Sequence, residues 1–132
     1  MPIAIDTSAV TAIVFGEPEA EALLSVMLAN IGDAVISAAT LVEATIVIES
    51  RQGPSATQDL YLLLEETRTA TVPLDGEQAE LASAAWRRFG KGNHEAALDL
   101  GDCYSYALSK ATGFPLLYKG RDFPRTDVLS AL

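Results

Sequence analysis

The alternation of short apolar runs with longer segments of helical periodicity most constrains the fold of this chain. Four runs have strand character, and they occupy residues 2–5, 34–36, 69–72 and 116–118. Segments with helical spacing lie between them. One opens at 7–8 and another at 55, and the others occupy 17–30, 37–51, 78–89 and 100–112. Strands that alternate with helices predict the α/β class, with a mainly parallel sheet inside a three-layer fold.

Capping signals bound several of these helices. Ser37 and Ser55 stand where an N-cap residue is expected, and Asp75 precedes Gln78 by three residues, as in a weak capping box. Gly53-Pro54 interrupts one helical segment, and Gly113 follows another in the position typical of a C-terminal glycine. These signals predict separate helices joined by short turns.

The size and composition of the chain limit the classes it can belong to. With 132 residues, 49% of them hydrophobic, residues 1–132 are predicted to form a single domain, and a disordered chain is excluded. Cys103 is the only cysteine, which excludes an intrachain disulfide and the zinc sites that need several cysteines. Neither a signal-peptide pattern nor a run of membrane-spanning length is present, so we expect no membrane association and a cytoplasmic location.

Four acidic residues stand where the local sequence is otherwise apolar or nearly uncharged. Asp6 ends the first apolar run, Glu43 lies in a helix with few charges, Asp102 lies at a helix start, and Asp122 follows the last strand. Sites in parallel α/β folds lie beyond the carboxyl ends of the strands, where Asp6 and Asp122 are expected. Taken singly, each acid has an ordinary interpretation. Asp6 and Asp102 could be helix N-terminal acids, Glu43 a solvated helix residue and Asp122 a turn aspartate.

Convergence of these acids would indicate a metal site. A charged and unpaired carboxylate on an apolar element costs several kcal/mol, and the first part of the chain has few basic residues to pair with. Like charges about 4 Å apart repel by roughly 4 kcal/mol at an effective dielectric of 20, so a divalent cation would have to neutralise them. Hard oxygen ligands favour Mg²⁺ or Mn²⁺.

The net charge of -9 should repel nucleic acid, but it is unevenly distributed. Through Trp86 the chain has 13 acidic and 2 basic residues, whereas from Arg87 onward it has 5 acidic and 7 basic residues. A polyanion should therefore approach the C-terminal third. The candidate phosphate contacts there, which we call the basic rim, are Arg87, Arg88, Lys91, Lys119, Arg121 and Arg125. Lone His94, in a loop rich in Gly and Asn, is expected to be an exposed bystander.

Several segments together resemble a PIN domain, and specifically the VapC-type toxin ribonucleases of toxin–antitoxin pairs. The similar segments run along nearly the whole chain: Ile-Asp-Thr-Ser-Ala at its start, Ala-Thr-Leu-Val-Glu-Ala at 39–44, Gly-Lys-Gly-Asn-His at 90–94, Leu-Gly-Asp-Cys-Tyr-Ser-Tyr-Ala-Leu at 100–108 and Leu-Leu-Tyr-Lys-Gly-Arg-Asp-Phe at 116–123. The last two are the most specific. The resemblance implies a PIN-like α/β/α fold with helices on both faces of the sheet.

The resemblance also implies site residues. Asp6, Glu43 and Asp102 match the main metal-binding, catalytic acids, and Asp122 matches a fourth whose contribution varies. Ser8 matches a supporting hydroxyl residue that orients a ligand or water. Asp99 departs from the family, which often has asparagine there, and it is expected to face solvent.

The function that the resemblance implies is a Mg²⁺- or Mn²⁺-dependent endoribonuclease toxin of a type II toxin–antitoxin system. Such an enzyme would cut structured RNA, such as tRNA or rRNA, with metal-activated water. The implied partners are a cognate VapB-like antitoxin, the RNA substrate and a second copy of the chain in a homodimer. Apolar residues of the N-terminal helices, including Val10, Ile13, Val14 and Phe15, would fit such partners or the core.

The sequence can be compared with three alternatives to a metal-dependent ribonuclease. A non-catalytic PIN-fold module would bind a protein or RNA without cutting it. A receiver-like domain needs an adjacent acidic pair after the first strand, and a haloacid-dehalogenase-type phosphatase needs Asp-x-Asp there. The sequence Asp6-Thr7-Ser8 matches neither of the last two patterns.

Overall fold

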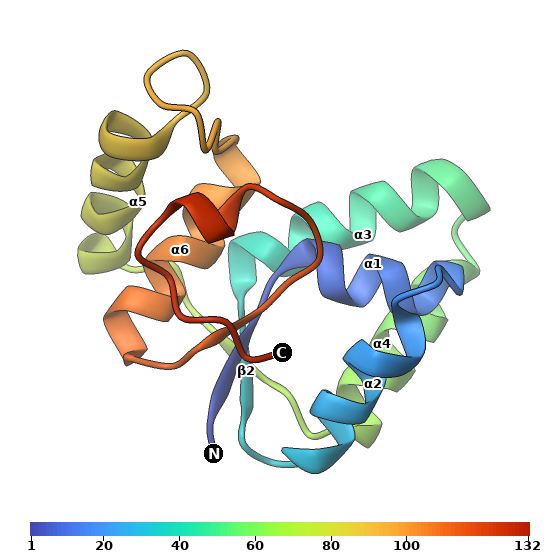
Figure 1. The fold of residues 1–132 in the computed structure, drawn as a ribbon. Helices are drawn as coiled ribbons and strands as arrows, with labels where there is room; N and C mark the ends of the chain where they lie inside the picture. The colour runs from blue at the N-terminus through green and yellow to red at the C-terminus, as the bar shows by residue number, and fades with distance from the viewer.

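A four-stranded parallel sheet forms the centre of the molecule, as predicted. The computed structural model describes residues 1–132, and its sheet has the order β3-β2-β1-β4 (Figure 1). The strands are β1 (Ile3–Ile5), β2 (Ala34–Ser37), β3 (Ala70–Val72) and β4 (Leu116–Leu117). Ile5 is in register with Ile36 on β2 and with Leu117 on β4, so three neighbouring strands end at one edge of the sheet.

Six α-helices connect the strands, and one 3₁₀ helix follows β4. They are α1 (Thr7–Phe15), α2 (Ala20–Ala29), α3 (Ala38–Gln52), α4 (Ala56–Glu66), α5 (Gly76–Phe89), α6 (Leu100–Thr112) and η1 (Phe123–Arg125). The side chain of Ser37 accepts the backbone N–H of Ala39 at 3.2 Å and caps α3, as its sequence position predicted. None of the helices combines the length and the apolar character that crossing a membrane requires.

Two of the predicted helix starts are wrong by a few residues. α2 begins at Ala20 and not at Glu17, because Pro18 lies in the turn that precedes it. α5 begins at Gly76, directly after its N-cap Asp75. The Asp75 side chain accepts the Gln78 N–H at 2.9 Å, but the reciprocal bond of a full capping box is missing, and Oε1 of Gln78 is buried without a partner.

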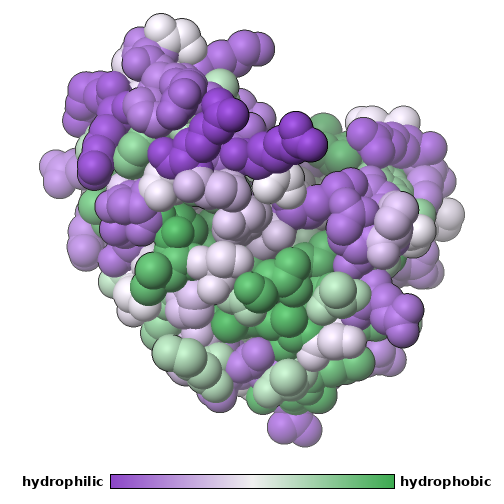
Figure 2. Space-filling view, in the orientation of Figure 1, coloured by the Kyte–Doolittle hydropathy of each residue, from purple (hydrophilic) through white to green (hydrophobic).

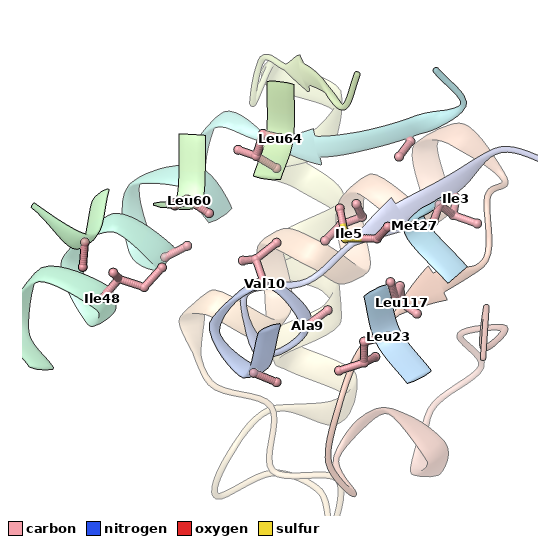
Figure 3. Close-up of a cluster of buried hydrophobic side chains, with 14 residues drawn as sticks. Ile3, Ile5, Ala9, Val10, Leu23, Met27, Ile48, Leu60, Leu64 and Leu117 are labelled. Atoms are coloured by element: carbon pink, nitrogen blue, oxygen red, sulfur yellow. The ribbon is translucent and has the colours of Figure 1, made fainter. Parts of the chain in front are cut away.

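Side chains alternate across the sheet and build a separate core on each face. Ile3 and Ile5 of β1 pack with α1, α2, α3 and α4, in the cluster that Figure 3 shows around Val10, Leu23 and Met27. Ala4, which lies between them, belongs to the opposite cluster with residues of α5 and α6 such as Phe89. This period of two confirms the three-layer arrangement.

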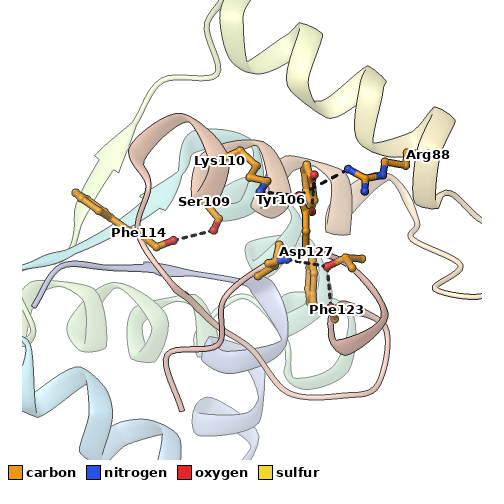
Figure 4. A network of polar contacts seen from close by, with 9 residues as sticks. Arg88, Tyr106, Ser109, Lys110, Phe114, Phe123 and Asp127 are labelled. Carbon is orange, nitrogen blue, oxygen red and sulfur yellow. Dashed lines mark hydrogen bonds and ion pairs between the residues drawn. The ribbon is translucent and has the colours of Figure 1, made fainter.

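The C-terminal segment folds back over β4 and α6. The Leu116 N–H donates to the Leu129 carbonyl at 2.8 Å, and the Ala131 N–H donates to the Leu116 carbonyl at 2.9 Å. Asp127 accepts the Tyr106 hydroxyl at 2.7 Å and forms an ion pair with Lys110 at 2.7 Å (Figure 4). These contacts fix the segment that carries η1 and its N-cap, Asp122.

Candidate acidic active site

Asp6 lies at the carboxyl end of β1 and is buried, with 3% of its surface exposed. It is the N-cap of α1: its Oδ2 accepts the Ser8 N–H at 3.1 Å and the Ser8 hydroxyl at 2.6 Å. Its Oδ1 accepts the hydroxyl of Ser105 on α6 at 2.5 Å. Burial raises the pKa of Asp6, and these hydrogen bonds offset only part of that effect.

Two hydroxyl residues hold Asp6 in place. Ser8 donates to Asp6 and accepts the Lys119 N–H at 2.9 Å, so it links the end of β1 to the segment after β4. Ser105 is fully buried, with the hydroxyl of Thr40 3.4 Å behind it. Ser8 was predicted from the sequence, whereas Ser105 was not. The available signal was a polar residue three positions after Asp102, on the buried side of an apolar helix.

Glu43 projects from α3 and is half-buried. Its Oε1 accepts the hydroxyl of Thr7, the residue after Asp6. Gly101, in the first turn of α6, faces the same carboxylate, and a Cβ at this position would overlap the oxygens of Glu43. Burial raises the pKa of Glu43, with further contributions from the negative charges of Asp6 and Asp99.

Asp102 lies in the first turn of α6 and forms a capping box with Asp99. The Asp102 N–H donates to Asp99 Oδ1 at 2.8 Å, and the Asp99 N–H donates to Asp102 Oδ2 at 3.1 Å. Burial, and then the charge of Asp6, raise the pKa of Asp102 to about 8, with smaller contributions from Asp99 and Asp122. Asp6 therefore repels both Glu43 and Asp102, and Asp122 adds to the repulsion at Asp102.

Asp99 faces solvent, as expected, but it also affects the site. Its side chain caps α6, and its charge contributes to the raised pKa of both Glu43 and Asp102. The aspartate found where the resembled family often has asparagine therefore increases the negative potential around the other acids.

The chemistry of this donor set fits a hard divalent cation. The donors are carboxylate oxygens, they repel one another, and none of them forms an ion pair with a basic residue. No three Asp, Glu, His or Cys side chains are assembled closely enough to hold an ion in their present positions. Asp6, Glu43 and Asp102 instead accept hydrogen bonds from the hydroxyls of Ser105, Ser8 and Thr7 and from the backbone N–H of Asp99.

The residues of the basic rim differ in whether they form ion pairs with acidic residues. Lys119 forms an ion pair with Glu17 and lies 3.5 Å from Glu19, and the hydrogen bond to Glu17 raises its pKa. Arg88 lies 3.7 Å from Asp127, and Arg125 lies 3.9 Å from Glu95. The three members without an ion pair are Arg87, Lys91 and Arg121.

His94 is not the exposed bystander that the sequence analysis expected. It is half-buried, its Nδ1 accepts the Ala96 N–H at 2.9 Å, and its ring meets Phe89 edge-on at 5.2 Å. The glycine-rich loop folds back on the end of α5, so the imidazole orders this loop.

Comparisons with known proteins agree on one family. The sequence profile of the PIN domain family matches residues 3–129. "Ribonuclease VapC" of Mycolicibacterium smegmatis is 48% identical over 94% of this chain and 95% of its own length. "Ribonuclease VapC30" of Mycobacterium tuberculosis is 42% identical over 94% of each chain. The crystal structure of Mycobacterium tuberculosis VapC20, described as a "Sarcin-Ricin loop cleaving toxin", superimposes with a TM-score of 0.79 at 17% identity over 96% of both chains.

Proposed function

The chain belongs to the PIN domain family, and from this membership we propose that it is a metal-dependent endoribonuclease toxin of the VapC type. Residues 1–132 would act as one PIN domain. The observation that carries the proposal is the gathering of Asp6, Glu43 and Asp102 beyond the strand ends, where burial raises the pKa of all three and the charge of Asp6 raises the pKa of Glu43 and Asp102 further. Relatives that share 42–48% of the sequence carry the name ribonuclease.

In the proposed mechanism, Asp6, Glu43 and Asp102 hold a divalent cation, Mg²⁺ or Mn²⁺, and Asp122 contributes a fourth carboxylate. When bound, such a cation lowers the pKa of a coordinated water and neutralises charge on the phosphate. Ser8 and Ser105 orient the two oxygens of Asp6, and the Thr7 hydroxyl orients Glu43. The absence of side-chain atoms at Gly101 leaves the room that the Glu43 carboxylate occupies.

The proposed substrate is structured RNA, such as tRNA or rRNA, which places the activity in the cytoplasm. Phosphates would be contacted by the basic rim, above all by the members without an ion pair: Arg87, Lys91 and Arg121. The proposed protein partners are a VapB-like antitoxin and a second copy of the chain. The net charge of -9 supports an antitoxin segment that is basic.

Cleavage of purified tRNA and rRNA by the antitoxin-free protein tests this proposal. We expect discrete cuts with Mg²⁺ or Mn²⁺ that disappear in chelator and in the Asp6→Asn and Asp102→Asn variants. An Asp59→Asn variant is the matched control, because Asp59 is an exposed acid on α4 away from the site. Comparing the two cations in the same assay identifies which one the site uses.

One observation favours the alternative, a PIN-fold module that binds a partner without cutting RNA. Asp6, Glu43 and Asp102 each accept a hydrogen bond from a hydroxyl or backbone donor, and no three acids are assembled for an ion. If the folded wild-type protein makes no cut in any RNA with either cation, while it retains an RNA or protein partner, the module is the correct description.

A further inference from the structure

A cleft of about 660 Å³ lies between α5 and α6, outside the cluster of acids. Its walls are mostly apolar and aromatic, and include Trp86 and Leu98, with Tyr104 opposite. Asp99, which caps α6 beside Asp102, lines the same cleft. The volume falls within the range of roughly 300–1,000 Å³ that is usual for small organic groups. The cleft is therefore large enough for one flat group of the size of a nucleotide base.

Trp86 presents an aromatic surface to solvent in this cleft. Its side chain is 52% exposed, which is unusual for the largest apolar residue of a small domain. Its position is fixed: the ring packs against Gly90, where a Cβ would overlap it, and the Asn93 side-chain amide donates to the Trp86 carbonyl at 3.2 Å. A rigid, exposed ring is a stacking surface that loses little conformational entropy on binding.

Two cations without a carboxylate partner line the same cleft. Arg87 and Lys91 form no ion pair, whereas Arg88, Lys110, Lys119 and Arg125 all lie within 4.0 Å of an acid. In a chain with 18 acidic residues, a pair of free cations beside an apolar cleft favours an external anion. In the view of Figure 2, hydrophilic residues gather over α5 and the loop after it, whereas hydrophobic residues gather lower, over the C-terminal segment.

The cleft shares two lining residues with a second cleft that reaches Glu43 of the acidic site. Leu100, which is 68% exposed, and Tyr104 line this cleft and also a second apolar cleft of about 410 Å³, in which Glu43 lies. Only Leu100 and Tyr104 of α6 therefore separate the cleft beside Glu43 from the cleft beside Trp86. An aromatic surface, free cations and a position next to the acidic site match the chemistry of single-stranded nucleic acid.

We propose that the cleft between α5 and α6 binds an unstacked base of single-stranded RNA beside the phosphate that is cut. Trp86 and Tyr104 provide the apolar faces against which the base stacks, and Arg87 and Lys91 contact the neighbouring phosphates. This subsite selects for an unpaired nucleotide, because a base inside a duplex cannot reach the ring of Trp86. The inference rests on the proposed ribonuclease function and specifies which RNA conformation that function needs.

The fluorescence of Trp86, the only tryptophan of the chain, reports directly on this subsite. The experiment titrates the full-length wild-type protein in chelator, which stops metal-dependent cleavage without changing a residue. The ligands are a short single-stranded RNA, its fully paired duplex and an abasic strand with the same number of phosphates. We expect quenching by the single strand alone, because the other two offer phosphates but no accessible base.

Substitutions distinguish the contribution of base stacking to RNA binding from the contribution of positive charge. Trp86→Ala should weaken binding of labelled single-stranded RNA, measured by anisotropy, by roughly ten- to a hundredfold and leave abasic binding unchanged. Trp86→Phe should restore part of the affinity. Arg87→Gln with Lys91→Gln should weaken both ligands and reduce the slope of log K against log salt by about 1.4. Tyr61→Ala, at a 51% exposed aromatic on α4, is the matched control and should change nothing.

Two results would overturn the base subsite. The first is Trp86 quenching that is equal for the abasic and the normal strand. The second is a Trp86→Ala variant with unchanged RNA affinity but a changed mass in light scattering, which would make this face a protein contact. Both can occur while metal-dependent cleavage persists, so failure of the subsite is distinguishable from failure of the proposed function.

Discussion

The hydroxyl of Ser105 donates a 2.5 Å hydrogen bond to Oδ1 of Asp6, across 99 residues of the chain. Ser8 donates to Oδ2 of the same carboxylate, so each oxygen of this buried acid has a hydroxyl donor. Hydroxyl donors fix the orientation of a carboxylate without neutralising its charge. The first acid of the site therefore retains the full attraction for a cation that a neighbouring arginine or lysine would remove.

Replacing Ser105 should weaken cation binding as well as stability. Ser105→Ala leaves a buried carboxylate oxygen without its donor, which costs about 1–3 kcal/mol in the free energy of unfolding. Loss of this bond also raises the pKa of Asp6 further, so protons compete better with a cation at neutral pH. Urea unfolding and calorimetric titration with Mn²⁺ measure the two effects.

The control for Ser105→Ala is Ser25→Ala, because the Ser25 hydroxyl bonds only to the Glu21 carbonyl on the exposed side of α2. The control should leave both measurements unchanged. Equal Mn²⁺ affinity in Ser105→Ala and wild type would show that Ser105 contributes to packing alone.

Gly101→Ala should impair cleavage although it adds a residue with better helix propensity. Alanine is roughly 0.5–1 kcal/mol better than glycine in a helix interior, but a Cβ here overlaps the Glu43 carboxylate and displaces it. A displacement of a catalytic group by about 1 Å can cost roughly a hundredfold in rate. Single-turnover cleavage and thermal unfolding measure the two effects separately.

Gly76→Ala is the comparison, because no atom lies within 4 Å of a Cβ at this first position of α5. It should retain wild-type cleavage. If Gly101→Ala retains it as well, the close approach of α6 to Glu43 is not required for activity.

Local sequence signals predicted the elements well where the caps are strong. α6 occupies Leu100–Thr112 as predicted, because Asp99 caps its start and Gly113 ends it with φ 75° in the left-handed region. The start of α2 was predicted three residues too early, because acidic residues that suit a helix N-terminus also occur in the turn around Pro18. Strand positions were accurate because each apolar run stops abruptly.

The site was predictable only in part. Asp6 and Asp122 follow strands, and the topology of a parallel sheet determines where such positions lie. The contacts of Ser105 and Gly101 depend on how α6 packs against β1 and α3, which no local pattern encodes. For the same reason the cleft beside Trp86 was not predicted.

The pH dependence of stability should reveal the repulsion at Asp102. The folded-state pKa of Asp102, about 8, lies above the ordinary aspartate value of 3.8, so the folded protein binds a proton more tightly than the unfolded chain. The contribution of Asp102 to the free energy of unfolding is fully present below about pH 4 and is lost as the pH rises through 8. Asp102→Asn should therefore gain stability relative to wild type as the pH rises from 4 to 8, with no further gain above.

Urea unfolding in chelator at several pH values measures this difference. The Asn oxygen can still accept the Asp99 N–H, so the capping box survives the substitution. A difference that is constant from pH 4 to 8 would show that Asp102 titrates as an ordinary exposed acid.

Binding of a divalent cation should reverse this loss of stability with rising pH. Binding requires ionised carboxylates, so the cation competes with protons and binds more tightly at pH 8 than at pH 6. At a concentration one hundred times the dissociation constant, it stabilises the folded state by about 2.7 kcal/mol. Thermal unfolding with and without Mn²⁺ should show a larger shift at pH 8, and no comparable shift in Asp102→Asn. An equal shift in that variant would indicate a cation site elsewhere.

Asp127 should stabilise the fold with the opposite pH dependence. Burial disfavours its charge, but the hydrogen bonds from Lys110 and Tyr106 outweigh this effect and lower its pKa (Figure 4). Because the folded pKa is depressed, its contribution is present above pH 3.8 and is lost as the pH falls through the folded value. Its side chain is 38% exposed, so solvent screening limits the contribution to about 1 kcal/mol.

Asp127→Asn should accordingly lower the free energy of unfolding by about 1 kcal/mol between pH 5 and 7, and by progressively less below pH 4. The Tyr106 hydroxyl can still donate to the asparagine oxygen, so the loss comes mainly from the ion pairs with Lys110 and Arg88. Asp33→Asn removes an exposed acid without an ion pair and should show neither change. A difference that persists undiminished at pH 3 would mean that packing of the C-terminal segment, and not the charge of Asp127, holds it on α6.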